Sequence, residues 1–192
     1  WSEEEGPMKV HYSQQNPEKR QGAHSDTIAT EEFLNFYNSL SNKDIDIMLE
    51  VKDKNISAVK CNNIIDPKSK NIDSDWGRYK YLVLEKSEKH YLKAREFVRE
   101  NKTKNVGLLY SVIEEGINLP ENKGQFLNAA NHVWGYFKSK ATENEKFKIL
   151  EHLKGYQTGV LGDKIIKKEL WGLARKYKVD FLINSYYFNE VR

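Results

Sequence analysis

Two patterns of apolar and polar residues divide the chain. Up to about residue 65, short runs in which apolar and polar residues alternate are separated by polar stretches and by segments with helical spacing. Beyond residue 70 the alternation ends, and long segments carry apolar residues at intervals of three and four. A strand sends successive side chains to opposite faces, whereas a helix gathers one apolar stripe. The pattern therefore predicts strands and helices in the first part and helices in the second.

The first part reads as strand, loop, helix, strand, helix. MKVHYS (8–13) alternates with period two, and a polar loop follows it. Thr30 is the expected N-cap of a helix over 31–40. DIDIMLEV (44–51) predicts a second strand, and KNISAVKCNNII (54–65) predicts a short helix. Strands that alternate with helices indicate a parallel βαβ architecture.

Helical periodicity fills the rest of the chain, where few residues break helices. The sequence thus predicts an α/β domain over 1–68 followed by an all-α domain over 69–192. The segment VDFLINSYYF (179–188) fits a helix and a strand equally well. The expected helices of the second domain span residues 76–100, 106–117, 123–139, 143–155 and 163–177.

Composition narrows the class of protein. The formal net charge is only +3 over 192 residues, too small to mark a dedicated DNA-binding domain. No run approaches the roughly 18 apolar residues of a membrane span. The single cysteine, Cys61, excludes an internal disulfide, and the acidic start of the chain does not resemble a secretory leader. We expect a cytoplasmic protein, and the start at Trp1 is typical of a segment of a longer one.

The candidate site residues lie on or next to the two predicted strands. Lys9 and His11 leave the same face of the first strand about 6.6 Å apart. His24 lies in the following loop, and Glu50 ends the second strand. The carboxyl ends of parallel strands carry the active site in barrel enzymes. Two imidazoles and a carboxylate are a mixed nitrogen and oxygen ligand set for a divalent metal.

A plainer interpretation stays open on spacing alone. A histidine on a strand is commonly a hydrogen-bonded structural residue. Glu50 can equally pair with Lys52 or Lys54 at the surface. The spacing of these residues does not decide between a metal site and a set of surface ion pairs.

Three motifs add a resemblance to this picture. GPMKVHYSQQN (6–16), GAHSDTI (22–28) and DIDIMLEVKDKNISAVKC (44–61) resemble, in order and spacing, the C-terminal part of the UV-damage endonuclease family. The resemblance implies the last two βα units of a TIM-type (β/α)₈ barrel. It also implies a cluster of divalent metals, typically manganese, and a DNA substrate that contains UV photoproducts.

The same resemblance assigns roles to individual residues. It makes His11, His24 and Glu50 metal ligands, and it places Lys9 at the position of a catalytic lysine that is carboxylated in the family. An ammonium group beside divalent cations is disfavoured unless it loses its charge. The implied reaction is hydrolysis of a phosphodiester by a metal-activated water. Tyr12, Ser13 and Asp26 lie beside these residues, and we expect them to support the site rather than contact DNA.

The chain holds only part of such a barrel. A complete barrel needs about 200 residues or more, and only two strands precede the helical part. We therefore expect the isolated chain to lack nuclease activity and to associate through its exposed barrel edge.

The helical part carries a second resemblance. KYLVLEKSEKHY (80–91), NAANHVWGYFK (128–138) and GYQTG (155–159) resemble a bacterial helical domain of unknown function. Asn128, Asn131 and His132 interrupt an apolar helix, which indicates a polar pocket, a cap for a neighbouring helix end, or core residues with satisfied hydrogen bonds; the last is favoured.

A row of basic residues supports the main rival hypothesis. Seven lysines and arginines between Arg78 and Arg99 load one predicted helix with positive charge. Such a helix suits contacts with DNA phosphates, although the interleaved glutamates favour a solvated, salt-bridged face. The rival hypothesis is a non-catalytic helical interaction or DNA-binding module.

Overall fold

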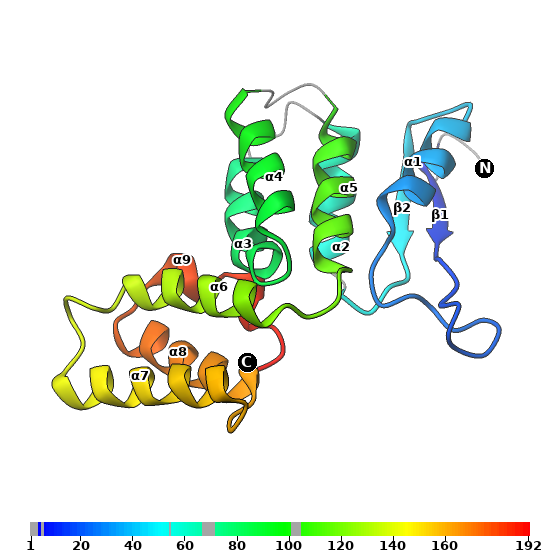
Figure 1. The fold of residues 1–192 in the computed structure, drawn as a ribbon. Helices are drawn as coiled ribbons and strands as arrows, with labels where there is room; N and C mark the ends of the chain where they lie inside the picture. The colour runs from blue at the N-terminus through cyan, green and yellow to red at the C-terminus, as the bar shows by residue number, and fades with distance from the viewer. Residues whose placement is uncertain (1–3, 5, 54, 67–71, 101–104) are drawn as a thin grey trace. The chain divides into compact units, whose positions relative to one another are not determined.

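The computed structural model describes residue 4 and residues 6–53, 55–66, 72–100 and 105–192 (Figure 1). Two compact units divide the chain. The N-terminal unit comprises Trp1–Asn71 and Thr103–Glu114, and the C-terminal unit comprises Ile72–Lys102 and Glu115–Arg192. The protein is mostly helical, with one small parallel sheet in the N-terminal unit.

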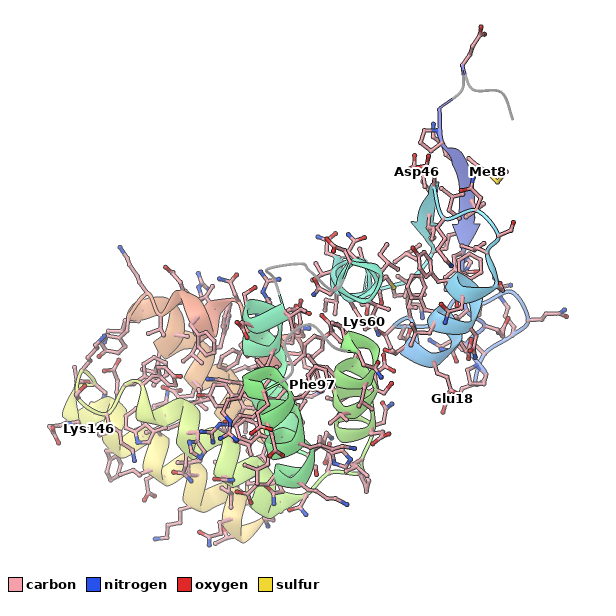
Figure 2. All side chains as sticks on the ribbon, turned by 90° about the horizontal axis from the view of Figure 1, so that it is seen from above. Met8, Glu18, Asp46, Lys60, Phe97 and Lys146 are labelled. Carbon is pink, nitrogen blue, oxygen red and sulfur yellow. The ribbon has the colours of Figure 1, made fainter. Side chains whose placement is uncertain are left out.

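The sheet pairs β1 (Met8–Tyr12) with β2 (Ile45–Leu49) in parallel, as the alternating pattern predicts. Lys9 lies opposite Asp46 in this register, and Figure 2 labels Asp46 on its strand. The helix α1 (Thr30–Ser39) connects the strands, and α2 (Asn55–Ile65) follows β2. This βαβα order confirms the predicted parallel architecture. The described residues contribute two strands to the sheet, so the complete barrel remains a prediction.

The first helix is capped by a distant residue. Thr30 is the first residue of α1 rather than its N-cap, which is Ala29. The Thr30 amide donates to Glu114 Oε2 at 3.0 Å, and its hydroxyl donates to Glu114 Oε1 at 2.7 Å. The prediction of a Thr30 cap was therefore wrong, because a carboxylate from α5 (Val106–Ile117) satisfies this helix end in its place.

One face of the sheet packs against helices. Ile28, Phe33 and Cys61 form a small buried cluster. Tyr12 stacks on Phe36 with ring centroids 4.3 Å apart. Burial raises the pKa of the Cys61 thiol to about 12, so this cysteine is an inert core residue. The opposite face of the sheet carries exposed side chains, including that of Lys9.

Helices build the C-terminal unit, as predicted. A core of fully buried side chains, among them Val133, Phe137, Ile149, Ile166 and Leu170, joins them. No helix within the described ranges has both the length and the apolar character needed to cross a bilayer. The elements are α3 (Ile72–Leu84), α4 (Glu88–Glu100), α6 (Lys123–Gly135), α7 (Glu143–Thr158), α8 (Asp163–Lys176), α9 (Asp180–Ile183) and the 3-10 helix η2 (Tyr186–Phe188).

A break divides the segment predicted as one helix over 76–100. The chain ends α3 at Leu84 and begins α4 at Glu88. Ser87 Oγ accepts the His90 N–H at 3.3 Å, which is the bond of a helix N-cap. The single-helix prediction was wrong because Ser87 starts a new helix within a continuous helical pattern.

The helix α5 begins in the N-terminal unit. Residues up to Glu114 group with that unit, although the sequence assigns them to the helical domain. Tyr110 accounts for part of this grouping of α5 with the N-terminal unit, since its hydroxyl accepts a hydrogen bond of 2.6 Å from Asn63 Nδ2. Polar contacts from α5 thus tie a sequence-distant segment to the βαβα unit.

Candidate metal centre

Glu50 lies between the two candidate histidines. His11 Nδ1 is 2.6 Å from Glu50 Oε1, and His24 Nε2 is 3.6 Å from Glu50 Oε2. Each carboxylate oxygen thus faces one imidazole. The three residues that the sequence nominates as metal ligands converge, although 39 residues separate His11 from Glu50 along the chain.

The strands place two of the three side chains. The Glu50 N–H donates to the Tyr12 carbonyl at 2.9 Å, which extends the parallel ladder by one residue beyond β2. In β1 the side chains of Val10 and Tyr12 are half-buried, whereas those of Lys9 and His11 are exposed on the other face. The site therefore lies at the carboxyl end of the sheet, on the face away from the helices.

A narrow loop returns His24 to the strand end. An isolated antiparallel bridge pairs Gln15 with His24, and the Ser25 N–H donates to the Gln14 carbonyl at 2.8 Å. Gly22 has a φ of +81°, a left-handed conformation that a residue with a Cβ rarely adopts. The turn explains how a histidine thirteen residues after His11 comes back beside it.

Lys9 shares an open cavity with His11. This cavity, of about 590 Å³, also touches Asp46 and Met48 on β2. Lys9 therefore stands beside the cluster of His11, His24 and Glu50, on the same face of the sheet.

The cluster is electrostatically complementary. The hydrogen bond from His11 lowers the pKa of Glu50, and the charges of His11 and His24 act in the same direction. Beside it, Lys52 donates to Asp26 Oδ1 at 2.6 Å, and this hydrogen bond is the main cause of the lowered pKa of Asp26. Both carboxylates thus hold their negative charge in an exposed, mixed-charge surface.

The arrangement is that of ion pairs rather than a preformed metal centre. Across the described part of the chain, no group of three or more His, Cys, Asp or Glu side chains has the spacing to hold a metal ion. His11 and Glu50 contact one another directly. The donor types nevertheless match the mixed nitrogen and oxygen set that divalent metals accept.

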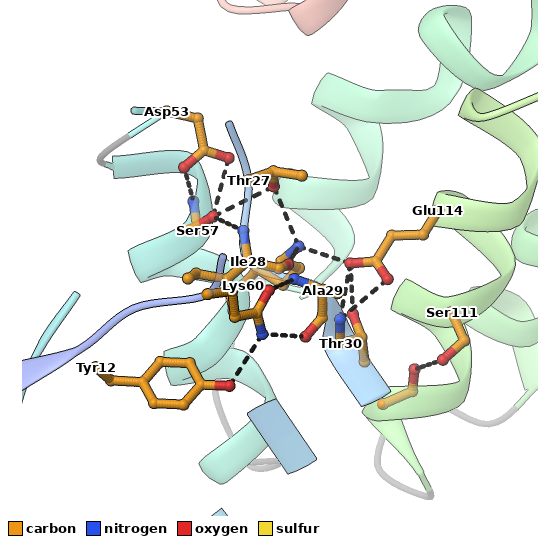
Figure 3. Close-up of polar contacts among 12 residues, drawn as sticks. Tyr12, Thr27, Ile28, Ala29, Thr30, Asp53, Ser57, Lys60, Ser111 and Glu114 are labelled. Carbon is orange, nitrogen blue, oxygen red and sulfur yellow. Dashed lines mark hydrogen bonds and ion pairs between the residues drawn. The ribbon is translucent and has the colours of Figure 1, made fainter. Parts of the chain in front are cut away.

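A buried network supports the loop that carries His24 (Figure 3). Lys60 Nζ donates to Glu114 Oε1 at 2.6 Å and also to the Ile28 carbonyl. Ser57 Oγ accepts the Ile28 N–H at 2.9 Å. Gln14 Oε1 accepts the Ala29 N–H at 2.6 Å. These side chains fix the chain just after His24, before it enters α1.

Sequence reasoning missed Lys60 and Glu114. Lys60 is 2% exposed, which is rare for a lysine. Helical spacing could have indicated that Lys60 is buried, because it places Lys60 on one stripe of α2 with Ser57, Cys61 and Ile64. Glu114 offers no comparable signal, since its partners lie 54 and 84 residues away.

Two of the three predicted polar residues of α6 lie at the surface. Asn131 and His132 are exposed, and Asn131 Nδ2 donates to the Leu127 carbonyl one turn earlier. The prediction that they interrupt a buried helix was wrong for these two residues, because α6 buries the opposite stripe, which includes Ala129, Ala130 and Val133.

Comparisons with known proteins decide the family. Residues 80–191 match the family model described as "Protein of unknown function (DUF1722)". The chain belongs to the DUF1722 family. The helical resemblance expected from the sequence is thereby confirmed.

This member of the DUF1722 family also has a curated relative. It is 32% identical over 177 residues to the UV DNA damage endonuclease of Clostridium perfringens (strain 13 / Type A). The match covers 88% of this chain and 42% of that protein. Neither unit alone makes up 88% of the chain, so the similarity extends over both. It confirms the resemblance expected from the three N-terminal motifs. No solved structure matches the chain.

Proposed function

We propose that this chain is the C-terminal portion of a UV DNA damage endonuclease and supplies one side of its metal site. The observation that carries the proposal is the convergence of His11 and His24 on the Glu50 carboxylate. The similarity to a protein of that name supports it. The substrate would be DNA that contains UV photoproducts, and the reaction would be hydrolysis of a phosphodiester beside the lesion.

His11, His24 and Glu50 would hold a divalent ion, which we propose is manganese. Bound there, the ion would supply activation of a water molecule and stabilisation of charge on the attacked phosphate. The chain's own contribution is to bring the ligands together: Glu50 pairs with His11, and the Gly22 turn brings His24 to the strand end, 3.6 Å from the Glu50 carboxylate. Lys9, on the same face, is proposed as a lysine that acts in its carboxylated form.

The chain spans 42% of the length of its curated relative, and further barrel strands would complete the site. Met8 and Met48 are 46% and 60% exposed on the two strands. Open strand edges with exposed apolar side chains favour pairing with further strands. We therefore propose that the isolated chain is inactive and associates through this sheet.

A chimera tests the proposal. The matching 42% of the Clostridium perfringens protein would be replaced by this chain, and nicking of UV-irradiated plasmid would be measured with added Mn²⁺. We expect the chimera to nick irradiated plasmid and the isolated chain not to. The Glu50→Gln and His24→Ala chimeras should lose activity at least a hundredfold, whereas Glu32→Gln, an exposed change in α1, should not.

Two results contradict the proposal. Nicking by the isolated chain would show that two strands suffice, and full activity of the Glu50→Gln chimera would exclude a role for the cluster. A folded chimera that binds DNA but does not nick it would favour the rival hypothesis, a non-catalytic DNA-binding module.

A further inference from the structure

The C-terminal unit contains a cavity that the proposed endonuclease reaction does not use. Its volume is about 290 Å³, and residues of α3, α6, α7 and α8 line it. Phe126 and Tyr156 form an aromatic corner, with ring centroids 4.6 Å apart and planes inclined by 49°. This corner offers apolar faces on which a small ligand can pack.

The lining of this cavity is acidic, although the whole chain is basic. Four carboxylates against two ammonium groups leave a formal charge of −2. Burial raises the pKa of the Tyr156 hydroxyl, and the negative charges of nearby acids raise it further. The charged residues of the lining are Glu85, Glu121, Asp163, Glu190, Lys86 and Lys167.

Glu85 gives the lining a buried polar anchor. It is 5% exposed, and Lys167 Nζ lies 2.9 Å from each of its oxygens. The hydrogen bond from Lys167 goes to Oε1. Among the described residues, Oε2 accepts no hydrogen bond. A buried carboxylate oxygen without a hydrogen bond is costly, so a donor from a ligand would be favourable there.

The aromatic rings already attract ammonium groups of the chain itself. Lys123 Nζ is 5.7 Å from the Tyr156 ring centroid, and Lys167 Nζ is 6.0 Å from that of Phe126. The faces of aromatic rings are negative and bind cations at such distances. The corner therefore combines the two features, carboxylates and ring faces, that recognise a positively charged nitrogen.

We propose that this cavity binds a small organic cation, a primary amine or a guanidinium compound with a short carbon chain. The positive group would bind to the acidic lining and Glu85, and the carbon chain would pack on Phe126 and Tyr156. An anion is disfavoured, because the formal charge of the lining is −2. This site belongs to the part of the chain that matches the DUF1722 model.

Calorimetric titration of the full chain with agmatine, at low ionic strength and pH 8, tests the proposal. We expect one binding site for agmatine and no saturable binding of inorganic phosphate at this cavity. The Glu121→Gln/Glu190→Gln variant keeps the fold, because both side chains are exposed, and should bind agmatine at least tenfold more weakly. Tyr156→Leu should weaken binding several-fold through loss of the ring.

Matched controls separate this cavity from the rest of the surface. Glu143→Gln removes an exposed acid of α7 that does not line the cavity, and it should leave agmatine affinity unchanged. Glu85→Gln should abolish agmatine binding in a folded chain. If Glu85→Gln does not fold, the Glu121→Gln/Glu190→Gln variant provides the test instead. Absence of agmatine binding up to 10 mM, or equal affinity in the wild type and the lining variants, would overturn the proposal.

Discussion

Lys60 Nζ lies 2.6 Å from Glu114 Oε1, and this pair joins α2 to α5 within the N-terminal unit (Figure 3). The side chain of Lys60 is 3% exposed and that of Glu114 is 20% exposed. Glu114 also caps α1 through Thr30. A single ion pair thus connects three helices and the loop that follows His24.

Replacing Lys60 with methionine should destabilise the N-terminal unit by about 3 kcal/mol, because it leaves the Glu114 carboxylate without its cation in a poorly solvated place. Hydrogen exchange of the α1 and α2 amides would report the loss as faster exchange in these helices. The matched control is Lys60→Met/Glu114→Gln, which removes both charges and should recover part of the stability. Unchanged protection in Lys60→Met would show that the pair contributes little.

Local periodicity accounts for most of the secondary structure. The alternation in 8–13 and 44–51 predicts both strands, and the predicted helix over 106–117 coincides with α5. The predictions of helix ends were wrong where a single side chain determines where a helix starts or how it is capped. Ser87 ends a helical pattern that looks continuous, and Glu114 takes over the cap expected from Thr30. A contact between residues 84 positions apart, such as Thr30 and Glu114, cannot be predicted from local spacing.

The C-terminal unit should lose stability as the pH rises from about 4.5 to about 7. Burial raises the pKa of Glu85 from 4.5 to about 7, while Lys167 and Lys86 oppose the shift and Glu190 adds to it. In this window folded Glu85 keeps its proton and the unfolded chain releases it. Unfolding therefore becomes easier at higher pH, by roughly 1 kcal/mol per pH unit.

Urea denaturation followed by tryptophan fluorescence checks this, since Trp76, Trp134 and Trp171 all lie in the C-terminal unit. The Glu85→Gln variant has no proton to release at this position, so its stability should vary less between pH 5 and pH 7 than that of the wild type. Parallel curves for the two proteins would disprove the assignment.

Gly172 offers a stabilising change. It lies inside α8, and a Cβ built there meets no atom within 4 Å. Alanine costs less backbone entropy than glycine in a helix, so Gly172→Ala should raise the stability of the C-terminal unit by about 0.5–1 kcal/mol. The same urea denaturation measures it. Gly155→Ala is the contrasting control, because its Cβ would come within 2.7 Å of Leu161, and a gain in that variant would contradict the packing described here.

Less of the candidate site than of the fold could be predicted from the sequence. Strand spacing places Lys9 and His11 on one face, and the structure agrees. Spacing alone could not bring His24 to Glu50, because that contact depends on the turn at Gly22 and the bridge between Gln15 and His24. The three motifs nominated the residues, whereas the geometry of the loop explains how they meet.

The proposed metal site predicts that the isolated chain binds manganese through His11, His24 and Glu50. Titration with Mn²⁺, monitored by the electron paramagnetic resonance signal of the free ion, should reveal one weak site per chain. Glu50→Gln removes the carboxylate that both histidines face, so it should weaken binding at least tenfold, and His11→Ala should do the same. His132→Ala, which removes an exposed histidine of α6, should leave binding unchanged. Equal binding by Glu50→Gln and the wild type would mean that these residues are surface ion pairs and that the metal hypothesis is wrong.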